Sequence, residues 1–356
     1  MSTLIIPCAG RSSRFPDMKP KWLLSHPEGE IMVQKSISGL NLDQFDRVII
    51  TIVKEHVEQF EADTILNQVF DFNNSKFELF ILDDFTSCQA ETVYLTLIGK
   101  DVKGKFAVKD SDNYIGVEIP ENWDIVVGLN INDYGRELYR LKSKSYLILN
   151  EQGIITDIIE KKIKSEVISI GLYGFNDASK FIKAYEHLIK DNNDYHEIYI
   201  SHIISYLIGT GKSVYRCVLT NDYEDWGTLS DWTAVLKRYS TYFINADGIL
   251  IKDCERFGTK NWNNSCEPIE KNIKTIAKLY NDGAQLIITT ARTEEYKTEL
   301  ENLLKKYNIK PHAIITGCNY APQTLINSFY NAKPFPTSFG INIQTGADLD
   351  KYLSVL

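Results

Sequence analysis

The sequence lacks the features that mark several classes of protein. Its six cysteines are scattered and form no C-x-x-C pair, which argues against a zinc site or a disulfide framework and indicates reduced thiols. No segment approaches the about 18 apolar residues of a membrane span, and the N-terminus shows no basic stretch followed by a long apolar one. We therefore expect no membrane span and no signal peptide, and a cytoplasmic protein.

An excess of basic residues is also absent. The chain carries 39 Lys and Arg against 47 Asp and Glu, which gives a formal net charge of −8. Because nucleic-acid-binding proteins usually carry a basic surface, nucleic acid is not an expected partner. A local cluster of arginine and lysine can still bind a small anionic substrate inside an acidic protein.

The chain contains neither an internal repeat nor a low-complexity linker. Apolar, β-rich segments alternate with longer amphipathic ones, which predicts an α/β architecture with a largely parallel sheet. The strands expected first are 3–7, 47–53, 77–82, 106–108 and 125–127, with helices at 32–40, 56–68 and 89–98. A hairpin is expected over 146–159, followed by a strand at 167–175 and helices at 178–189 and 197–208.

The length of 356 residues favours two domains, because a single core rarely grows to that size. The strand pattern restarts near residue 240, so we expect domains at 1–238 and 239–356. The second is predicted to be a smaller, doubly wound α/β unit. Its expected elements are strands at 242–244, 285–289, 313–316 and 338–343 and helices at 268–281, 294–307 and 321–329.

Residues 4–24 form the most informative stretch. A short apolar strand leads into a turn of small residues with two arginines, Arg11 and Arg14, and Lys21 then opens an apolar run. A turn free of bulky side chains lets backbone N–H groups approach a phosphate, and nearby cations bind the rest of a polyanion. Gly10 is the one glycine of this turn, so neither G-x-G-x-x-G nor G-x-x-x-x-G-K-[ST] is present. An ordinary strand, turn and helix with surface cations is the alternative.

Two aspartates stand where carboxylates could bind a metal. Asp110 and Asp112 directly follow the expected strand at 106–108, and carboxylates at the carboxyl end of a strand can offer oxygen ligands to Mg²⁺. Solvated polar turns are the alternative interpretation.

Taken in order, these segments resemble the sugar-phosphate nucleotidyltransferase family, whose signature is G-x-G-x-R followed by P-K-x-L-L. Gly10 and Ser12 stand at the two glycine positions, Arg14 at the arginine and Lys21 at the lysine. The resemblance implies a GT-A-like, Rossmann-like domain over residues 1–238.

Further elements carry the same resemblance. The segment TSCQAET at 86–92 stands where the family reads the base, although a helix capped by Thr86 or Ser87 is the alternative. DWGT at 225–228 resembles D-x-G-T, and EKK at 160–162 resembles E-K-P with a lysine in place of proline.

The resemblance implies a role for each matched residue. Arg14 would hold the β- and γ-phosphates and stabilise the departing pyrophosphate, and Lys21 would neutralise the α-phosphate. The implied nucleotide contacts are Pro7, Ala9, Gly10, Ser12, Gln89 and Ala90; the metal ligands are Asp225 with Asp110 or Asp112; the acceptor contacts are Glu160, Lys161 and Gly171. The implied partners are Mg²⁺, an NTP (CTP, dTTP, UTP or GTP) and a phosphorylated small molecule.

The second domain resembles a degenerate haloacid-dehalogenase (HAD)-like domain. In YFINADGIL at 242–250, Asn245 stands at the position of the nucleophilic aspartate and Asp247 at that of the acid/base. Thr290 and Lys333 resemble phosphate contacts of that superfamily. Because a neutral carboxamide is a poor nucleophile, we expect no phosphatase activity. A structural element, a homo-oligomerisation surface and a ligand-sensing module are the alternatives.

The resemblances together imply a nucleotidyltransferase of the EC 2.7.7 type that activates a phosphorylated sugar for capsular or other surface polysaccharide synthesis. An alternative on the same fold is a cytidylyltransferase for a polyol, choline or amino-alcohol phosphate. A regulator that binds ligands without turnover is an alternative of another class. The presence of Arg14, Lys21, Asp112 and Asp225 favours an enzyme.

Overall fold

The computed structural model describes residues 1–16, 18–73, 75–135, 138, 141–191, 197–253, 266–328 and 338–353. The chain forms two compact units, Met1–Trp232 and Thr233–Leu356. The division lies inside helix α7 (Leu229–Arg238), at Trp232 rather than at the Arg238 boundary expected from the sequence. The first turn of α7 belongs to the first unit because the Trp232 ring packs against the rings of His26 and Trp226.

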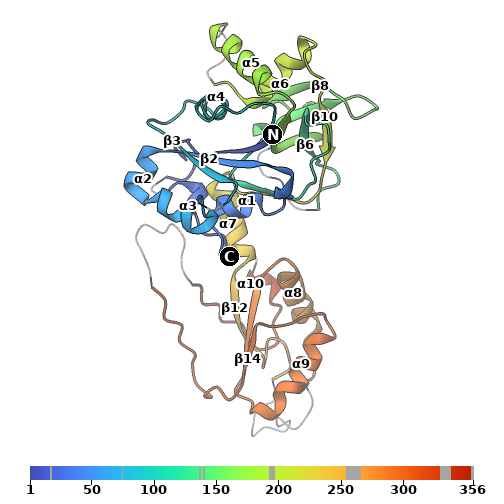
Figure 1. The fold of residues 1–356 in the computed structure, drawn as a ribbon. Helices are drawn as coiled ribbons and strands as arrows, with labels where there is room; N and C mark the ends of the chain where they lie inside the picture. The colour runs from blue at the N-terminus through green and yellow to red at the C-terminus, as the bar shows by residue number, and fades with distance from the viewer. Residues whose placement is uncertain are drawn as a thin grey trace. The chain divides into compact units, whose positions relative to one another are not determined.

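The first unit is built on a nine-stranded mixed sheet (Figure 1). Seven strands follow the order β10-β6-β9-β4-β1-β2-β3, and β7 pairs with β8 and β9 beside this path. The strands are β1 (Ser2–Pro7), β2 (Arg47–Val53), β3 (Phe77–Leu82), β4 (Lys105–Lys109), β6 (Ile125–Asn130), β7 (Ser145–Leu149), β8 (Ile155–Glu160), β9 (Val167–Phe175) and β10 (Arg216–Leu219).

The part of the sheet around β1 is parallel, as the sequence predicts. β1 pairs in parallel with β2 and β4, and β2 pairs in parallel with β3. Consecutive residues Leu4, Ile5 and Ile6 are fully buried, the continuous apolar run typical of a strand covered on both faces. Since parallel strands end at the same edge, the turns that follow β1 and β4 lie beside each other.

Helices cover both faces of this sheet (Figure 1). One face carries α1 (Met32–Ile37), α2 (Lys54–Phe60) and α3 (Ala62–Phe70), and the other carries α4 (Gln89–Gly99), α5 (Ala178–Lys190) and α6 (Ile200–Gly209). The single helix expected over 56–68 is wrong: Glu61 adopts a left-handed φ of 52°, which interrupts a right-handed helix. Within the described ranges, no helix combines the length and the apolar character needed to cross a membrane.

Short elements complete the first unit. The single turns of 3-10 helix are η1 (Lys21–Leu23), η2 (Leu42–Gln44) and η3 (Leu141–Ser143). Strands β5 (Asn113–Ile115) and β11 (Tyr223–Asp225) form a separate two-stranded antiparallel sheet. This small sheet brings the acidic turn after β4 next to the segment that precedes α7.

The second unit contains a three-stranded parallel sheet of β12 (Thr241–Asn245), β13 (Gln285–Thr289) and β14 (Ala313–Ile315). Its helices are α8 (Glu270–Asn281), η4 (Glu294–Tyr296), α9 (Lys297–Lys305) and α10 (Asp350–Leu353). The helix expected at 321–329 and the strand expected at 338–343 are wrong for the described residues, 321–328 and 338–343. Residues 321–328 are all exposed, including Ile326 at 90 %, so no apolar face is packed that would stabilise a helix.

Candidate active site

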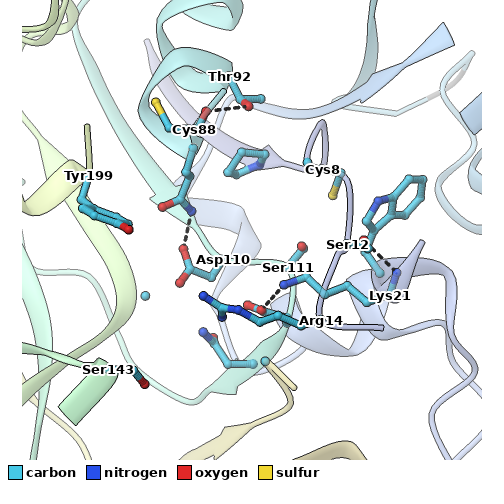
Figure 2. Close-up of a pocket in the computed structure, with 18 of the residues that line it drawn as sticks. Cys8, Ser12, Arg14, Lys21, Cys88, Thr92, Asp110, Ser111, Ser143 and Tyr199 are labelled. Carbon is cyan, nitrogen blue, oxygen red and sulfur yellow. Dashed lines mark hydrogen bonds and ion pairs between the residues drawn. The ribbon is translucent and has the colours of Figure 1, made fainter. Parts of the chain in front are cut away.

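A cavity of about 590 Å³ opens beside the turns that follow β1 and β4 (Figure 2). Further lining residues come from the start of α4 and from β7, β8, β9 and β11. Most residues that the sequence assigned to a site line it: Pro7, Gly10, Ser12, Arg14, Lys21, Gln89, Asp110, Asp112, Glu160, Gly171 and Asp225. Segments from opposite ends of the first unit therefore meet at one place.

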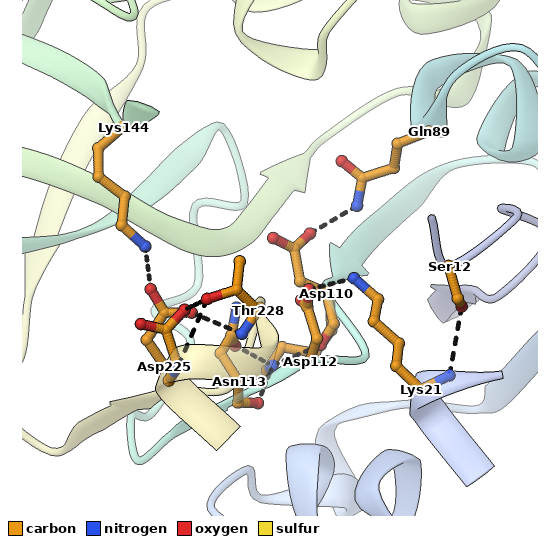
Figure 3. A network of polar contacts seen from close by, with 12 residues as sticks. Ser12, Lys21, Gln89, Asp110, Asp112, Asn113, Lys144, Asp225 and Thr228 are labelled. Carbon is orange, nitrogen blue, oxygen red and sulfur yellow. Dashed lines mark hydrogen bonds and ion pairs between the residues drawn. The ribbon is translucent and has the colours of Figure 1, made fainter. Parts of the chain in front are cut away.

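The turn after β1 contains a serine in a conformation that glycine usually adopts. Ser12 has a φ of 50°, in the left-handed region. Its hydroxyl accepts a hydrogen bond from the backbone N–H of Lys21 at 3.2 Å (Figure 3). An added Cβ on Gly10 would meet no atom within 4 Å, so the turn is open there. Ser12 thus adopts a backbone conformation typical of glycine, and its hydroxyl holds the N–H at the start of η1.

Two residues expected to contact the nucleotide are buried and do not reach the cavity. Ala9 and Ala90 are buried and do not line the cavity. The carbonyl of Ala9 accepts a hydrogen bond from the Thr86 N–H at 3.4 Å, which connects the β1 turn to the segment before α4. The N-cap of α4 is Cys88, without a side-chain cap bond, so neither Thr86 nor Ser87 caps this helix.

Asp110 and Asp112 have different partners (Figure 3). The Asp110 carboxylate accepts a hydrogen bond from Gln89 Nε2 at 2.5 Å, whereas the Asp112 carboxylate forms an ion pair with Lys21. Burial and the neighbouring Asp112 carboxylate raise the pKa of Asp110 to about 6. Burial alone would raise the pKa of Asp112, but the Lys21 ammonium more than offsets this and lowers it. Asp112 is therefore the carboxylate whose negative charge is stabilised.

The small β5–β11 sheet brings Asp112 and Asp225 together. Asn113 pairs with Asp225 in the antiparallel register, and the Trp226 N–H donates to the Asp112 carbonyl at 2.9 Å. The Gly227 N–H then donates to Asp225 Oδ1 at 3.0 Å. A Cβ on Gly227 would lie 3.1 Å from Asp225 Oδ1 and 3.3 Å from Asp112 Oδ2. Oxygens of the two carboxylates therefore border one small space, which a glycine leaves open.

This carboxylate pair fits a divalent cation that takes its remaining ligands from a substrate. Mg²⁺ is commonly held by one or two carboxylates together with phosphate oxygens and water. Asp110 does not join the pair as a third close ligand: in the described part of the chain, the three-residue group whose ligand atoms all lie within 4.8 Å of one another is elsewhere, at His26, Glu28 and Glu30. The sequence left Asp110 and Asp112 as alternatives, and the geometry favours Asp112.

A buried lysine forms hydrogen bonds with the acidic turn that follows β4. Lys109 is fully buried, and its Nζ donates to the carbonyls of Asp110 at 2.7 Å and Asn113 at 2.8 Å and to Asn113 Oδ1 at 2.5 Å. Burial lowers the pKa of Lys109 to about 8, while Asp110 and Asp112 oppose this effect. The sequence analysis missed Lys109, which lies between the expected strand at 106–108 and Asp110, because a single lysine there gives no spacing signal.

Lys144 is a second site residue that the sequence analysis missed. It directly follows η3, lines the cavity and forms an ion pair with Asp225 (Figure 3). The hairpin predicted from the sequence could have pointed to Lys144, because the pairing of its two strands places Lys144 across from Lys161. The register of β7 with β8 pairs Ser145 with Glu160, so the residue before β7 lies opposite Lys161.

Cys8, next to the β1 turn, is not a nucleophile. Its side chain is 2 % exposed. Burial raises the pKa of Cys8 to about 12, so the thiol stays protonated at neutral pH. The site therefore offers no reactive thiolate at this position.

Glu160 and Lys161 point to different surroundings. The Glu160 carboxylate lines the cavity and accepts hydrogen bonds from the hydroxyls of Ser145 at 2.5 Å and Ser201 at 2.7 Å. Lys161 has a φ of 55° and does not line the cavity. Its Nζ donates to the Tyr199 hydroxyl and lies 4.3 Å from the centre of the Tyr199 ring. Of this pair, Glu160 alone faces the space where an acceptor would bind.

Gly171 on β9 permits a close backbone approach. Its φ is 91°, and an added Cβ would lie 2.3 Å from Asp110 Oδ2. The Asp110 N–H donates to the Gly171 carbonyl at 2.8 Å. Glycine is therefore required here so that β9 and the acidic turn can pack together.

In the second unit, the residues that resemble a phosphatase motif bind one another. The Thr290 hydroxyl donates to Asp247 Oδ2 at 2.7 Å, and Arg292 Nε donates to Asp247 Oδ1 at 2.8 Å. The Asn245 amide donates to the Asp247 carbonyl at 2.9 Å. Asn245 and Asp247 line a cavity of about 660 Å³, whereas Thr290 is buried and does not line it. Lys333 lies outside the described residues.

No family model and no curated protein sequence matches the chain. Several solved structures are similar in fold. The nucleoside-diphosphate-sugar pyrophosphorylase from Vibrio cholerae RC9 is 20 % identical with a TM-score of 0.55, and the match covers 66 % of this chain and 99 % of that protein. The inositol-1-phosphate CTP transferase from T. maritima is 13 % identical with a TM-score of 0.51, covering 64 % and 90 %.

A third structure, from Bacillus anthracis and provisionally assigned as a glucose-1-phosphate thymidylyltransferase, is 17 % identical with a TM-score of 0.52, covering 66 % and 94 %. The matched share of this chain is close to that of the first unit, 232 of 356 residues. About two thirds of the chain therefore has the mixed α/β fold of known nucleotidyltransferases.

Proposed function

We propose that the first unit catalyses Mg²⁺-dependent nucleotidyl transfer from an NTP to a phosphorylated small molecule, with release of pyrophosphate. The observation that carries this proposal is the meeting of Asp112 and Asp225 at Gly227, inside a cavity that Lys21 and Arg14 also line. Carboxylates for a metal and cations for phosphates then stand around one space. The similarity in fold to nucleotidyltransferases supports the proposal.

The reaction needs alignment and charge neutralisation more than proton transfer. An oxygen of the acceptor phosphate attacks the α-phosphorus, and the bond from that phosphorus to the pyrophosphate oxygen breaks. Because the attacking oxygen is already anionic, no strong general base is required. Positive groups placed around the triphosphate are therefore the main contribution of the protein.

Individual residues supply these groups. Bound by Asp112 and Asp225, Mg²⁺ would neutralise charge on the triphosphate. Lys21 begins η1 beside the β1 turn, from where its ammonium would bind the α-phosphate. Arg14 is exposed at the cavity and would bind the β- and γ-phosphates, which also stabilises the leaving pyrophosphate. Gln89, at the start of α4, would face the base.

A phosphorylated sugar destined for capsular or other surface polysaccharide is the proposed acceptor. Glu160, held by two serine hydroxyls, presents carboxylate oxygens that accept hydrogen bonds from sugar hydroxyls. A cytidylyltransferase for a polyol or amino-alcohol phosphate is the second candidate. It is favoured by the Tyr199 ring, which already holds the ammonium of Lys161 at 4.3 Å and would suit a cationic acceptor.

For the second unit we propose a HAD-like domain without phosphatase activity. Asn245 cannot form the acyl phosphate that an aspartate forms, because its amide is a poor nucleophile. Asp247 is engaged by Arg292 and Thr290, which supports a structural role for this group. Hydrolysis of an aryl phosphate by the full chain that Asp247→Ala abolished would contradict this.

The test is pyrophosphate release by the purified full chain. The four nucleotides CTP, dTTP, UTP and GTP are each combined with a panel of sugar, polyol and amino-alcohol phosphates in the presence of Mg²⁺. We expect one nucleotide and one acceptor class to give turnover that EDTA abolishes and that Asp225→Asn lowers on the order of 10²–10³-fold. The proposed function would be refuted if no pair of nucleotide and acceptor gave turnover, or if turnover were unchanged by EDTA and by Asp225→Asn.

A further inference from the structure

Both carboxylates of the proposed metal site are already bound by lysines. Lys21 pairs with Asp112, and Lys144 pairs with Asp225. All four side chains are between 16 % and 21 % exposed, so the two ion pairs lie in the partly shielded cavity rather than on the open surface. In Figure 3 the two lysines approach the carboxylates from opposite sides.

A divalent cation and these ammonium groups compete for the same oxygens. Two positive charges within about 4 Å of each other repel strongly in a partly desolvated site. Binding of a metal by Asp112 and Asp225 would therefore release both lysines. Each released ammonium would remain in the cavity, where it needs a new anionic partner.

The backbone keeps Lys144 at the cavity. Its N–H donates to the Leu141 carbonyl at 3.1 Å, which closes η3, and its carbonyl accepts from the Lys161 N–H at 3.1 Å. Lys144 lies on the side of Ser145 and Glu160, where the acceptor is proposed to bind, whereas Lys21 lies on the side of the β1 turn.

Lys161 does not line the cavity itself, and its ammonium is already bound. Its Nζ donates to the hydroxyl of Tyr199, which lines the cavity and in turn donates to Glu197 at 2.5 Å. Lys161 would therefore have to leave the Tyr199 hydroxyl before it could make the phosphate contact that the E-K motif implies for it. Lys144 is the lysine that lines the cavity on this side.

We propose that Lys144 binds the phosphate of the acceptor and that it exchanges Asp225 for this phosphate when the metal enters. The inference rests on the proposed function. It makes Lys144 a catalytic residue of the acceptor side, matched to Lys21 on the nucleotide side. The ion pairs with Asp112 and Asp225 then keep both lysines in place before substrates bind.

Two measurements test the assignment. In steady-state assays, Lys144→Met is expected to raise the KM for the acceptor and to lower kcat on the order of 10²-fold, with the KM for the NTP little changed. Inorganic phosphate, used as a competitive inhibitor against the acceptor, should inhibit the wild type and fail to inhibit Lys144→Met. Lys144→Arg retains the charge and should recover part of both properties.

The second measurement needs no turnover. Without Lys144, Asp225 is free to bind metal, so Lys144→Met should bind Mn²⁺ more tightly than the wild type, on the order of tenfold, in a titration followed by electron paramagnetic resonance. Lys142→Met is the matched control, because Lys142 is an exposed lysine on η3 that does not line the cavity. Its kinetics and Mn²⁺ affinity should equal those of the wild type.

The outcomes separate the inference from the proposed function. Absence of pyrophosphate release by the wild type would refute the proposed function. Wild-type turnover together with an unchanged acceptor KM and unchanged phosphate inhibition in Lys144→Met would refute the role of Lys144 alone. Loss of phosphate inhibition in Lys161→Met but not in Lys144→Met would return the role to Lys161, and unchanged Mn²⁺ affinity in Lys144→Met would refute the exchange at Asp225.

Discussion

Gly227→Ala tests the proposed metal site by adding a single methyl group between its ligands. The new Cβ would lie 3.1 Å from Asp225 Oδ1 and 3.3 Å from Asp112 Oδ2, closer than carbon and oxygen normally pack. Gly227 has no left-handed φ, so alanine can adopt its backbone without strain. The perturbation therefore acts on the two carboxylates and not on the fold.

The expected magnitudes follow from this geometry. The carboxylates must move by a few tenths of an ångström, and both are about four-fifths buried side chains at an open cavity, so we expect a cost of about 1 kcal/mol in the free energy of unfolding. Mg²⁺ requires nearly octahedral geometry with ligands at about 2.0–2.1 Å, so the same displacement should weaken metal binding strongly. Since a misplacement of about 1 Å can lower a rate about 10²-fold, we expect kcat to fall about 10- to 10²-fold.

The assay compares melting temperature, Mn²⁺ affinity and pyrophosphate release for Gly227→Ala and the wild type. We expect the melting temperature to fall by about 2–4 °C or less while Mn²⁺ affinity and kcat fall clearly. Gly209→Ala is the control, since a Cβ there meets no atom within 4 Å and the residue does not line the cavity. Wild-type Mn²⁺ affinity and turnover in Gly227→Ala would show that Asp112 and Asp225 do not share a metal.

Three further perturbations have defined outcomes. Gly171→Ala should destabilise the protein by about 3 kcal/mol in urea unfolding, because its φ of 91° and the 2.3 Å approach to Asp110 both exclude a Cβ; a loss below about 1 kcal/mol would contradict this. Burial lowers the pKa of His56 to about 4, so the wild type should lose up to about 3 kcal/mol as pH falls from about 6.5 to 4. His56→Phe should lack that loss, and parallel pH profiles of the two proteins would refute the assignment. Arg292→Ala removes the cation that forms an ion pair with the Asp247 carboxylate, so it should destabilise the second unit by about 3–5 kcal/mol. We expect faster amide exchange in β12–β14 and unchanged exchange in β1–β4; wild-type exchange rates in β12–β14 would refute this.

Local patterns in the chain were sufficient for the α/β architecture and for most cavity residues. The apolar runs at β1, β2 and β3 and the helix after TSC give local signals that hold without tertiary information. Residues at the carboxyl ends of parallel strands meet at one edge wherever such a sheet forms. The turn after β1 and the acidic turn after β4 could therefore be assigned to the same edge of the sheet from the sequence, whereas the pairing of β1 with β4 that makes them neighbours came from the structure.

Other features depend on contacts between distant segments. The interruption at Glu61 is a backbone conformation that the apolar pattern of 56–68 does not reveal. The apolar residues of 321–328 suggested a helix, but the described residues there find no surface to cover. At 321–328 the helical pattern of the sequence was present, and the absence of packing decided the outcome.

The sequence by itself identified the residue types of the site, because aspartates, lysines and glycines near the ends of expected strands can be recognised from their positions in the chain. Their partners were decided by tertiary structure. Asp112 rather than Asp110 meets Asp225 because β5 pairs with β11, and Lys144 lines the cavity whereas Lys161 binds the hydroxyl of Tyr199 at its edge. The pairing of β5 with β11 joins segments more than 100 residues apart, so no local spacing encodes which aspartate meets Asp225.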